Sequence, residues 1–328
     1  MSVIERPIRA VDRFQQGHRS LAFPFAVFKK FGEDQAGNLA ALIAYYGFFS
    51  LFPLLLVLVT VLGLVLQNNP DLQKKILDSA LSQFPVIGDQ LKVGSISGSG
   101  LALAVGIVTA LWAGLGVVQA FQNAMNTVWG VPMVARPNFI KSRLRSVAML
   151  AVLGVGIVVA ALLGGVTAGR GGDWYLVVGG IAASLVLNIA LFLLAFKVLT
   201  VAKVSWRDVL PGAIIAGVAW AILQAVGGYI VGHQLKNASA TYGALAFVIV
   251  LLFWIYLGAQ MTLLAAEANT VKAKRLWPRS LLQPPLTEED KRALAEQAVR
   301  ETRRPEEVVD VRFNESGEPQ PDQRGFTS

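Results

Sequence analysis

Six long apolar blocks, none of which contains Lys, Arg, Asp, Glu or His, constrain this chain more than any other feature. They span residues 39–66, 101–131, 146–168, 174–196, 209–232 and 242–266. About 20 predominantly apolar residues are enough for a helix to cross the hydrocarbon core of a bilayer. Strands with open edges would leave backbone groups unpaired in lipid, so each block is predicted to be helical. The expected fold class is all-α: a polytopic bundle of six transmembrane helices with interfacial amphipathic helices.

The composition of the whole chain leads to the same class. Of the 328 residues, 54% are hydrophobic and only 15% are charged, whereas a soluble domain typically has about 25% charged residues. The chain has no cysteine and only two histidines, His18 and His233, which excludes disulfides, a thiolate nucleophile and a multi-histidine metal site. Phosphate-loop, nucleophile-elbow and H-E-x-x-H motifs are also missing. We therefore expect neither enzymatic activity nor a metal or other cofactor.

Positive charge is distributed unevenly between the connections. Lys and Arg gather before the first block, between the second and third, between the fourth and fifth, and after the sixth; the alternate connections are poorer in them or balance them with Asp. Because Lys- and Arg-rich segments stay on the cytoplasmic side, both termini are predicted to be cytoplasmic. This topology and attraction to anionic lipid headgroups explain the net charge of +8. Membrane lipids are the expected partners, and no nucleic acid is needed.

The chain divides into three predicted parts. These are a cytoplasmic N-terminal segment (1–38) with an interfacial helix near 24–31, a transmembrane domain (39–271), and a cytoplasmic tail (272–328) that is largely disordered. Apolar residues at helical spacing across 72–84 predict a further amphipathic helix on the outer face. In the tail, Thr287 and Asp290 have the spacing of a capping box that starts one exposed helix. From residue 305 onward the composition is typical of disorder.

The first block carries a candidate kink. Tyr46, Ser50 and Pro53 lie at i, i+4 and i+7, hence on one face of the helix. Pro53 has no N–H for the carbonyl of Phe49, so the helix is predicted to bend there. A structural kink is the favoured interpretation, and a hinge or polar notch beside a substrate path is the alternative.

Two further blocks carry polar residues at helical spacing. Gln119, Gln122 and Asn126 form a polar face on the second block, and Ser184 and Asn188 lie four residues apart on the fourth. Amides in lipid are costly unless they are paired, so both faces are predicted to point into the bundle. They either bond neighbouring helices together or line a polar cavity, and the pattern leaves both interpretations open.

Three residues of the sixth block are candidates for a gate or an interface. Tyr242 and Gly243 stand at its outer end, and Glu267 follows it directly at the cytoplasmic edge. With Lys272 and Lys274 close by, Glu267 is expected to form a salt bridge at the membrane surface. A role in gating is the alternative.

Several of these segments resemble one family. Residues 44–54, with the sequence AYYGFFSLFPL, are similar to the first-span signature of the YihY / virulence-factor BrkB family, and the resemblance covers about residues 25–274. Supporting matches are Ala124-Met125-Asn126 with Trp129, Tyr242-Gly243-Ala244, and Ala266-Glu267-Ala268-Asn269. The resemblance implies a six-span protein of the bacterial cytoplasmic (inner) membrane. The family has also carried a ribonuclease label, which we do not transfer because the chain lacks a His/Asp metal cluster.

The leading hypothesis is therefore a transporter or flippase-like protein for a lipid or envelope-precursor substrate. A membrane scaffold that organises envelope machinery without transport is the alternative, and a membrane enzyme ranks last. The pattern of residues assigns no oligomeric state.

Overall fold

The computed structural model describes residues 5–65, 71, 100–168, 174–230 and 236–313, and every regular element in these ranges is a helix. The elements are α1 (Glu5–Gly17), α2 (Arg19–Glu33), α3 (Ala36–Val65), α5 (Gly100–Val128), the short 3₁₀ helix η1 (Met133–Ala135), α6 (Phe139–Ala168), α7 (Trp174–Leu199), α8 (Trp206–Ile230), α9 (Lys236–Lys274) and α10 (Glu288–Arg300). The predicted all-α class is confirmed for this part of the chain. The helix predicted across 72–84 lies outside the described residues.

Within the described residues, three helices contain segments long and apolar enough to cross a membrane. These segments are Val178–Leu199 in α7, Trp206–Gly227 in α8 and Val248–Lys274 in α9. They coincide with the fourth, fifth and sixth predicted blocks. α3, α5 and α6 coincide with the first three blocks, but part of each has side chains outside the described residues. The count of six spans therefore stays a prediction.

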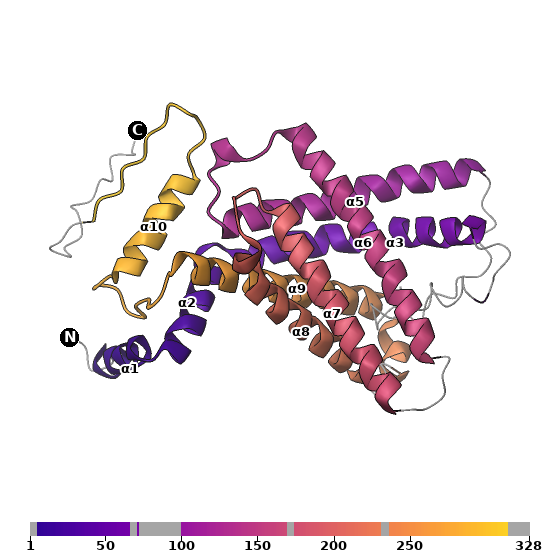
Figure 1. The fold of residues 1–328 in the computed structure, drawn as a ribbon, viewed down its shortest axis with the longest axis horizontal. Coiled ribbons are helices and arrows are strands. Elements are labelled where there is room, and N and C mark those ends of the chain that lie inside the picture. Colours follow the sequence, from indigo (N-terminus) through magenta and orange to yellow (C-terminus); the bar gives the residue numbers. More distant parts are fainter. Residues whose placement is uncertain (1–4, 66–70, 72–99, 169–173, 231–235, 314–328) are drawn as a thin grey trace.

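The long helices pack through small side chains. Figure 1 shows α3 and α5 side by side along the long axis of the molecule, with α6, α7 and α8 crossing them obliquely. The buried core between these helices is rich in alanine: Ala36, Ala40, Ala120, Ala124, Ala213, Ala216, Ala259, Ala265 and Ala266. A Cβ at Gly212 of α8 would lie 2.3 Å from the carbonyl oxygen of Ala265 in α9. Small residues are therefore what allow these backbones to approach so closely.

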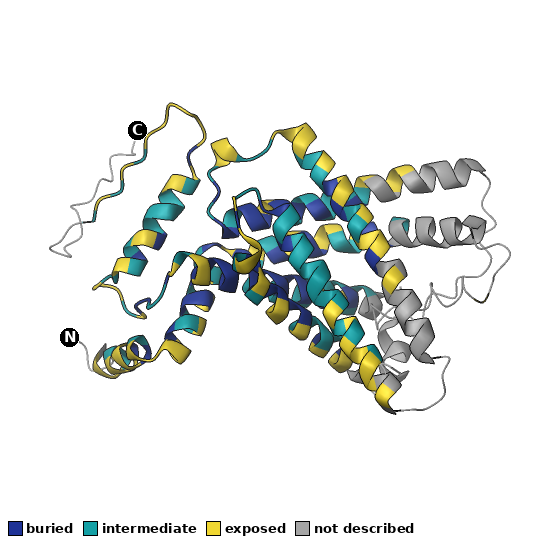
Figure 2. Cartoon of the chain, viewed as in Figure 1, coloured by how far each residue is buried: buried dark blue, intermediate teal, exposed yellow. Residues whose placement is uncertain are grey.

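α1, α2, the end of α9 and α10 lie at one end of the molecule (Figure 1). The capping box at Thr287 and Asp290 forms as predicted and starts α10. However, α10 is not the freely exposed helix we expected, because Asp290 and Ala293 are buried. Figure 2 shows residues of intermediate burial alongside exposed ones on this helix. The tail is thus ordered through Arg300, since its charged side chains have partners on α2. Residues 314–328, part of the segment predicted to be disordered, lie outside the described residues.

Candidate functional site

An open groove of about 520 Å³ lies between α3 and α5. Its wall consists of Leu42, Tyr45, Tyr46 and Phe49 from α3, Trp112, Ala113, Gly116, Gln119, Ala120 and Asn123 from α5, and Arg143 from α6. The aromatic rings of this groove are unusually accessible, with Trp112 79% exposed and Phe49 56% exposed. Gly116 matters for its shape, because a Cβ there would lie 3.0 Å from the Tyr46 ring. Among the described residues, this aromatic groove offers far more space than the cavity of about 10 Å³ beside Lys30, Asp34 and Arg300.

The aromatic groove has an apolar part and a cationic end. Tyr45 and Phe49 pack ring against ring with centroids 4.9 Å apart, which makes one wall flat and aromatic. At the other end, the Arg136 guanidinium donates to Oδ1 of the groove residue Asn123 at 2.6 Å. Arg143, which lines the groove, lies 4.9 Å above the ring of Phe139. An apolar wall with a few convergent polar groups is the usual form of a small-molecule site.

The structure separates the three residues predicted to share a face of α3. Tyr46 lines the aromatic groove. Ser50 is buried instead, and its hydroxyl donates to the carbonyl oxygen of Gly47 at 2.9 Å. Pro53 lies within α3, which continues to Val65. A serine hydroxyl bonded to its own helix is a local structural device, so the structural interpretation holds for Ser50.

The polar face of α5 also divides. Gln119 lines the aromatic groove, whereas Gln122 is buried and bonds α6: its Nε2 donates to the Ser142 carbonyl at 3.0 Å and to Ser146 Oγ at 2.8 Å. Asn126 is buried as well, and its Oδ1 accepts the backbone N–H of Val201 at 3.1 Å. Gln122 and Asn126 thus bond helices and connections together, and Gln119 alone of the three faces a cavity.

The two candidates on α7, Ser184 and Asn188, are not among the described residues that line the aromatic groove. Ser184 is exposed on the surface of α7 and Asn188 is half-buried, so the prediction of an inward polar stripe is wrong at Ser184. That face of α7 is not covered by a neighbouring helix, which periodicity alone could not show. Tyr242 and Gly243 belong to α9, but their side chains lie outside the described residues.

Of the eleven residues that line the aromatic groove, the sequence pattern singled out only Tyr46 and Gln119. Among the other nine, Tyr45 and Trp112 look like ordinary lipid-facing aromatics in an apolar block. The common signal of all nine is proximity in space across three helices, which spacing along one helix does not reveal.

Glu267 lies in a second polar region, at the junction of α2, α9 and α10. It is fully buried, and the ammonium Nζ of Lys30 in α2 lies 2.9 Å from its Oε2. We expected Lys272 or Lys274 to be the partner; the correct partner is more than two hundred residues away in sequence. Lys272 is exposed, because the helix turns it away from the face that carries Glu267.

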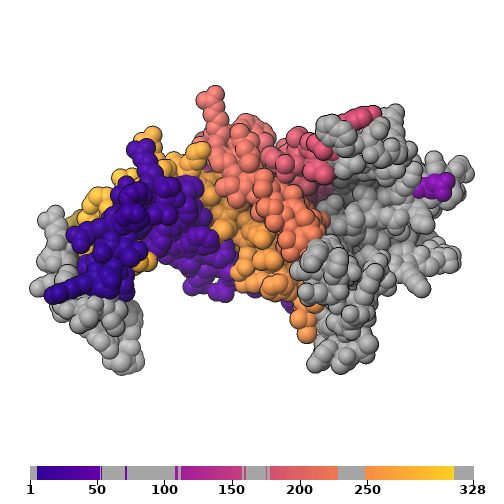
Figure 3. All heavy atoms as spheres, turned by 90° about the horizontal axis from the view of Figure 1, so that it is seen from below, coloured from indigo at the N-terminus to yellow at the C-terminus, as the bar shows by residue number. Residues whose placement is uncertain are grey.

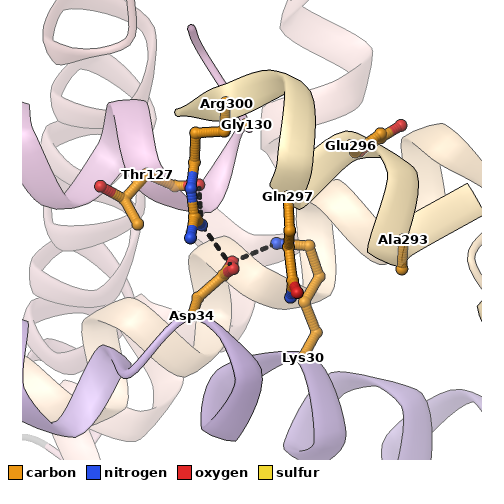
Figure 4. A pocket seen from close by; sticks show the side chains of 8 residues that line it. All are labelled: Lys30, Asp34, Thr127, Gly130, Ala293, Glu296, Gln297 and Arg300. Atoms are coloured by element: carbon orange, nitrogen blue, oxygen red, sulfur yellow. Dashed lines mark hydrogen bonds and ion pairs between the residues drawn. The ribbon is translucent and has the colours of Figure 1, made fainter. Parts of the chain in front are cut away.

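Lys30 also bonds Asp34 and donates to the carbonyl oxygen of Val128 at 2.8 Å. Burial alone would lower the pKa of Lys30, but the carboxylates of Glu267 and Asp34 raise it above the usual value for lysine. From α10, Arg300 donates to the other oxygen of Asp34 at 2.7 Å (Figure 4). Opposite charges therefore balance one another under α10.

A second group of ion pairs lies beside the first. Arg279 is fully buried and bonds Glu33 at 2.7 Å and Asp290 at 2.5 Å. Asp290 also accepts from Lys29 at 2.8 Å and from the hydroxyl of Ser280 at 2.7 Å. Burial would raise the pKa of Asp290, but these donors hold it well below its usual range. We call the two groups together the buried ion-pair network: Lys29, Lys30, Glu33, Asp34, Glu267, Arg279, Asp290 and Arg300.

The buried ion-pair network holds the ends of the chain together. Every member has a charged partner of opposite sign, and α2 is joined in this way to both α9 and α10. Within the described residues, no group of three or more His, Asp or Glu side chains is arranged to hold a metal ion. The arrangement serves to fix helices in place, whereas the aromatic groove offers space and accessible surface to a ligand.

Comparison with known proteins identifies relatives over most of the chain. A sequence profile described as Virulence factor BrkB matches residues 27–287. A ribonuclease-like protein of Bacillus subtilis, YfkH, is 26% identical over 268 residues, which cover 78% of this chain and 96% of that protein. A UPF0761 membrane protein of Stenotrophomonas maltophilia, Smlt0865, is 27% identical over 289 residues, or 84% of this chain and 66% of the longer relative.

A UPF0761 membrane protein of Xanthomonas euvesicatoria, XCV0968, is similar at 25% identity over 300 residues, which cover 87% of this chain and 69% of that protein. No solved structure matches the chain. The profile match includes the aromatic groove and most of the buried ion-pair network, but it ends before Asp290 and Arg300. Those two side chains of α10 therefore lie beyond the part that the family profile describes.

Proposed function

The chain belongs to the BrkB virulence factor family of membrane proteins, and from that premise we propose that it binds and moves an anionic lipid or lipid-like envelope precursor across the bacterial cytoplasmic membrane. The observation that carries the proposal is the aromatic groove, with its apolar wall and its cationic end. An acyl chain fits against Tyr45, Phe49 and Trp112. An anionic headgroup fits beside Gln119 and Arg143.

The proposal includes a topology. We propose six spans formed by α3 and α5–α9, with both termini in the cytoplasm. α3 has 30 residues and α5 has 29, and a helix rises 1.5 Å per residue, so about 20 residues cross a bilayer core. Arg136 of the connection after α5, and Lys141 and Arg143 at the start of α6, then lie on the cytoplasmic side. The cationic end of the groove is placed at the headgroup layer of that leaflet.

Binding at this site is favourable for physical reasons. Aromatic rings combine a large apolar area with polar edges, and they are common where one end of a site is apolar and the other is wet. A guanidinium binds phosphate with two parallel hydrogen bonds, which adds geometric selectivity to charge attraction. The groove is partly open to the surroundings, and we propose that a lipid enters it from the side without leaving the bilayer.

The experiment is lipid translocation in proteoliposomes. Purified protein is reconstituted with a fluorescent-labelled phosphatidylglycerol or phosphatidylcholine, and transfer between leaflets is followed by chemical quenching of the outer leaflet. We expect faster transfer of the anionic lipid, and loss of this acceleration in Trp112→Ala and Arg143→Gln. Ile214→Ala, at an exposed apolar position of α8, is the matched control and should transfer lipid normally.

Equal transfer by the groove variants and the control would overturn the assignment of the site. If the wild-type protein accelerates neither lipid but still supports growth of the host under envelope stress, the scaffold hypothesis takes its place. Folding of each variant is checked by monodisperse elution in detergent, so that loss of transfer is not mistaken for loss of structure.

A further inference from the structure

α1 directs two polar side chains, Asp12 and Gln15, toward the protein and two apolar ones, Val11 and Phe14, outward. We propose that this outward face docks on the anionic headgroup layer of the membrane that holds the helical bundle. The proposal does not depend on the proposed transport, because it concerns a surface at the end of the molecule, away from the aromatic groove.

The inward face of α1 is polar and well bonded. Asp12 and Gln15 are the only buried side chains among its described residues. Gln15 donates to Oδ1 of Asp12 at 3.0 Å and to the carbonyl oxygen of Arg279 at 2.7 Å. Asp12 Oδ1 also accepts the backbone N–H of Leu281 at 2.9 Å. These bonds fix the rotation of α1 about its axis and hence decide which side chains point away.

The outward face is apolar along one strip and basic along the next. Val11 and Phe14 are each 58% exposed and lie at i and i+3 on one side of the helix. Arg6 and Arg13, both exposed, lie along the neighbouring edge. Because Asp12 is used inside, the described charged side chains on the outward face are all guanidinium groups.

The same character continues onto α2, where Leu21 and Phe28 are exposed and Arg19 begins the helix. Figure 3 shows this indigo N-terminal segment forming an uncovered surface at one end of the molecule. An apolar strip left in water is unfavourable. A helix with an apolar face and adjacent Arg residues is stable at a membrane surface, where the apolar side chains enter the acyl boundary and the cations meet anionic lipids.

These features favour lipid over a protein partner. A protein interface typically has an apolar centre surrounded by a mixed polar rim, whereas here the flanking described charges are of one sign. The chain also belongs to a family of membrane proteins. The anionic headgroup layer of the membrane is therefore close to α1. Anionic phospholipid is therefore the occupant to which we commit.

The absence of cysteine from the chain allows a direct test. Phe14→Cys in the full-length protein is labelled with a polarity-sensitive fluorophore and placed in nanodiscs of phosphatidylcholine alone or of phosphatidylcholine with phosphatidylglycerol. We expect a blue-shifted emission in the anionic discs and a loss of iodide quenching by about threefold or more, reversed by high salt. Arg292→Cys on the exposed side of α10 is the control and should stay accessible to iodide in both.

The charge requirement has its own variant. Arg6→Gln with Arg13→Gln should abolish the difference between the two nanodiscs while the elution profile and lipid transfer stay unchanged. A label at position 14 that is equally accessible to iodide in both discs would overturn the proposal. Protection that persists in detergent and grows with protein concentration would overturn it too, by assigning the face to a second copy of the chain.

Discussion

The aromatic groove and the buried ion-pair network differ in where their polar side chains lie and in what those side chains contact. In the network, Arg279 and Glu267 are fully buried, and each has a charged partner from another helix. In the groove, large rings are exposed and the polar groups lie at one end of an open volume. The first arrangement leaves a cavity of only about 10 Å³ beside Lys30, Asp34 and Arg300, whereas the second offers a much larger volume and accessible rings.

This contrast between buried pairs and accessible groups indicates which charged residues of a membrane protein are candidates for function. A buried charge is costly, and its partners have to compensate for that cost before the fold is stable. Glu267 therefore stands out in the sequence, at the end of an apolar block, because of a structural requirement. Arg143 attracts no notice in the sequence, but it lies where a ligand can reach it. Mutation of each kind of residue distinguishes charges that stabilise the fold from charges that a ligand can reach.

Removing Arg279 should have the largest effect on stability. Arg279→Met leaves Asp290 without its buried partner, and breaking a buried pair in this way costs about 3–5 kcal/mol. Thermal unfolding in detergent measures the loss. The control is Lys291→Met, which removes one half of an exposed pair on α10 and should leave the unfolding temperature unchanged. A comparable loss in both variants would contradict the division between structural and surface charges.

Lowering the pH should weaken the packing of α10, with the next largest effect on stability. The folded pKa of Asp290 is lowered, so its contribution is fully present above the unfolded pKa of about 3.8 and is lost as the pH falls through the folded value. Hydrogen exchange of the α10 backbone, corrected for intrinsic rates, should therefore be constant from neutral pH down to about pH 5 and rise below pH 4. In Asp290→Asn, α10 should exchange faster already at neutral pH and lose the acid dependence.

The cationic end of the aromatic groove should matter for binding and not for folding. Arg143→Gln should weaken binding of an anionic amphiphile about tenfold, or about 1.4 kcal/mol, while binding of a zwitterionic one changes little. Titration of detergent-solubilised protein with each amphiphile measures the two affinities. Lys141→Gln is the control, because Lys141 is exposed two residues before Arg143 on α6 and does not line the groove. Equal weakening by both changes would point to general charge attraction.

Two glutamines one turn apart on α5 should respond in opposite ways. Gln122→Leu removes bonds to α6 and should destabilise the protein by about 0.6–1.7 kcal/mol without changing amphiphile affinity. Gln119→Leu should leave stability nearly unchanged and alter affinity. Thermal unfolding and amphiphile titration are measured on both variants. Loss of affinity in Gln122→Leu together with loss of stability in Gln119→Leu would contradict the roles assigned to the two residues.

Much of the fold was predictable because each helix carries its own signal. Long apolar blocks predict the positions of α3 and α5–α9, although α6 and α9 extend well beyond the blocks that predict them. The capping box at Thr287 predicts the start of α10. The partners were not predictable. Glu267 was assigned to nearby lysines, whereas Lys30 is its partner, since an ion pair depends on distance in space and the folded chain brings residues 30 and 267 together.

The candidate site was only half predictable for a related reason. Periodicity places Gln119, Gln122 and Asn126 on one polar face of a helix, but it does not say which neighbour each of them meets. In the structure Gln122 bonds α6, and Asn126 bonds the connection after α7. Gln119 lines the aromatic groove instead. Ser184 shows the same limit of periodicity, because its face of α7 was predicted to point inward and is exposed.

Sequence alone determined that this chain is helical, because apolar stretches of this length satisfy their backbone only within helices when lipid is the solvent. It determined the family through short signatures that the comparisons confirm. Only the tertiary structure decided which polar side chains bond helices together and which line a cavity. That choice depends on how helices cross, and crossing is set by packing between side chains distant along the chain.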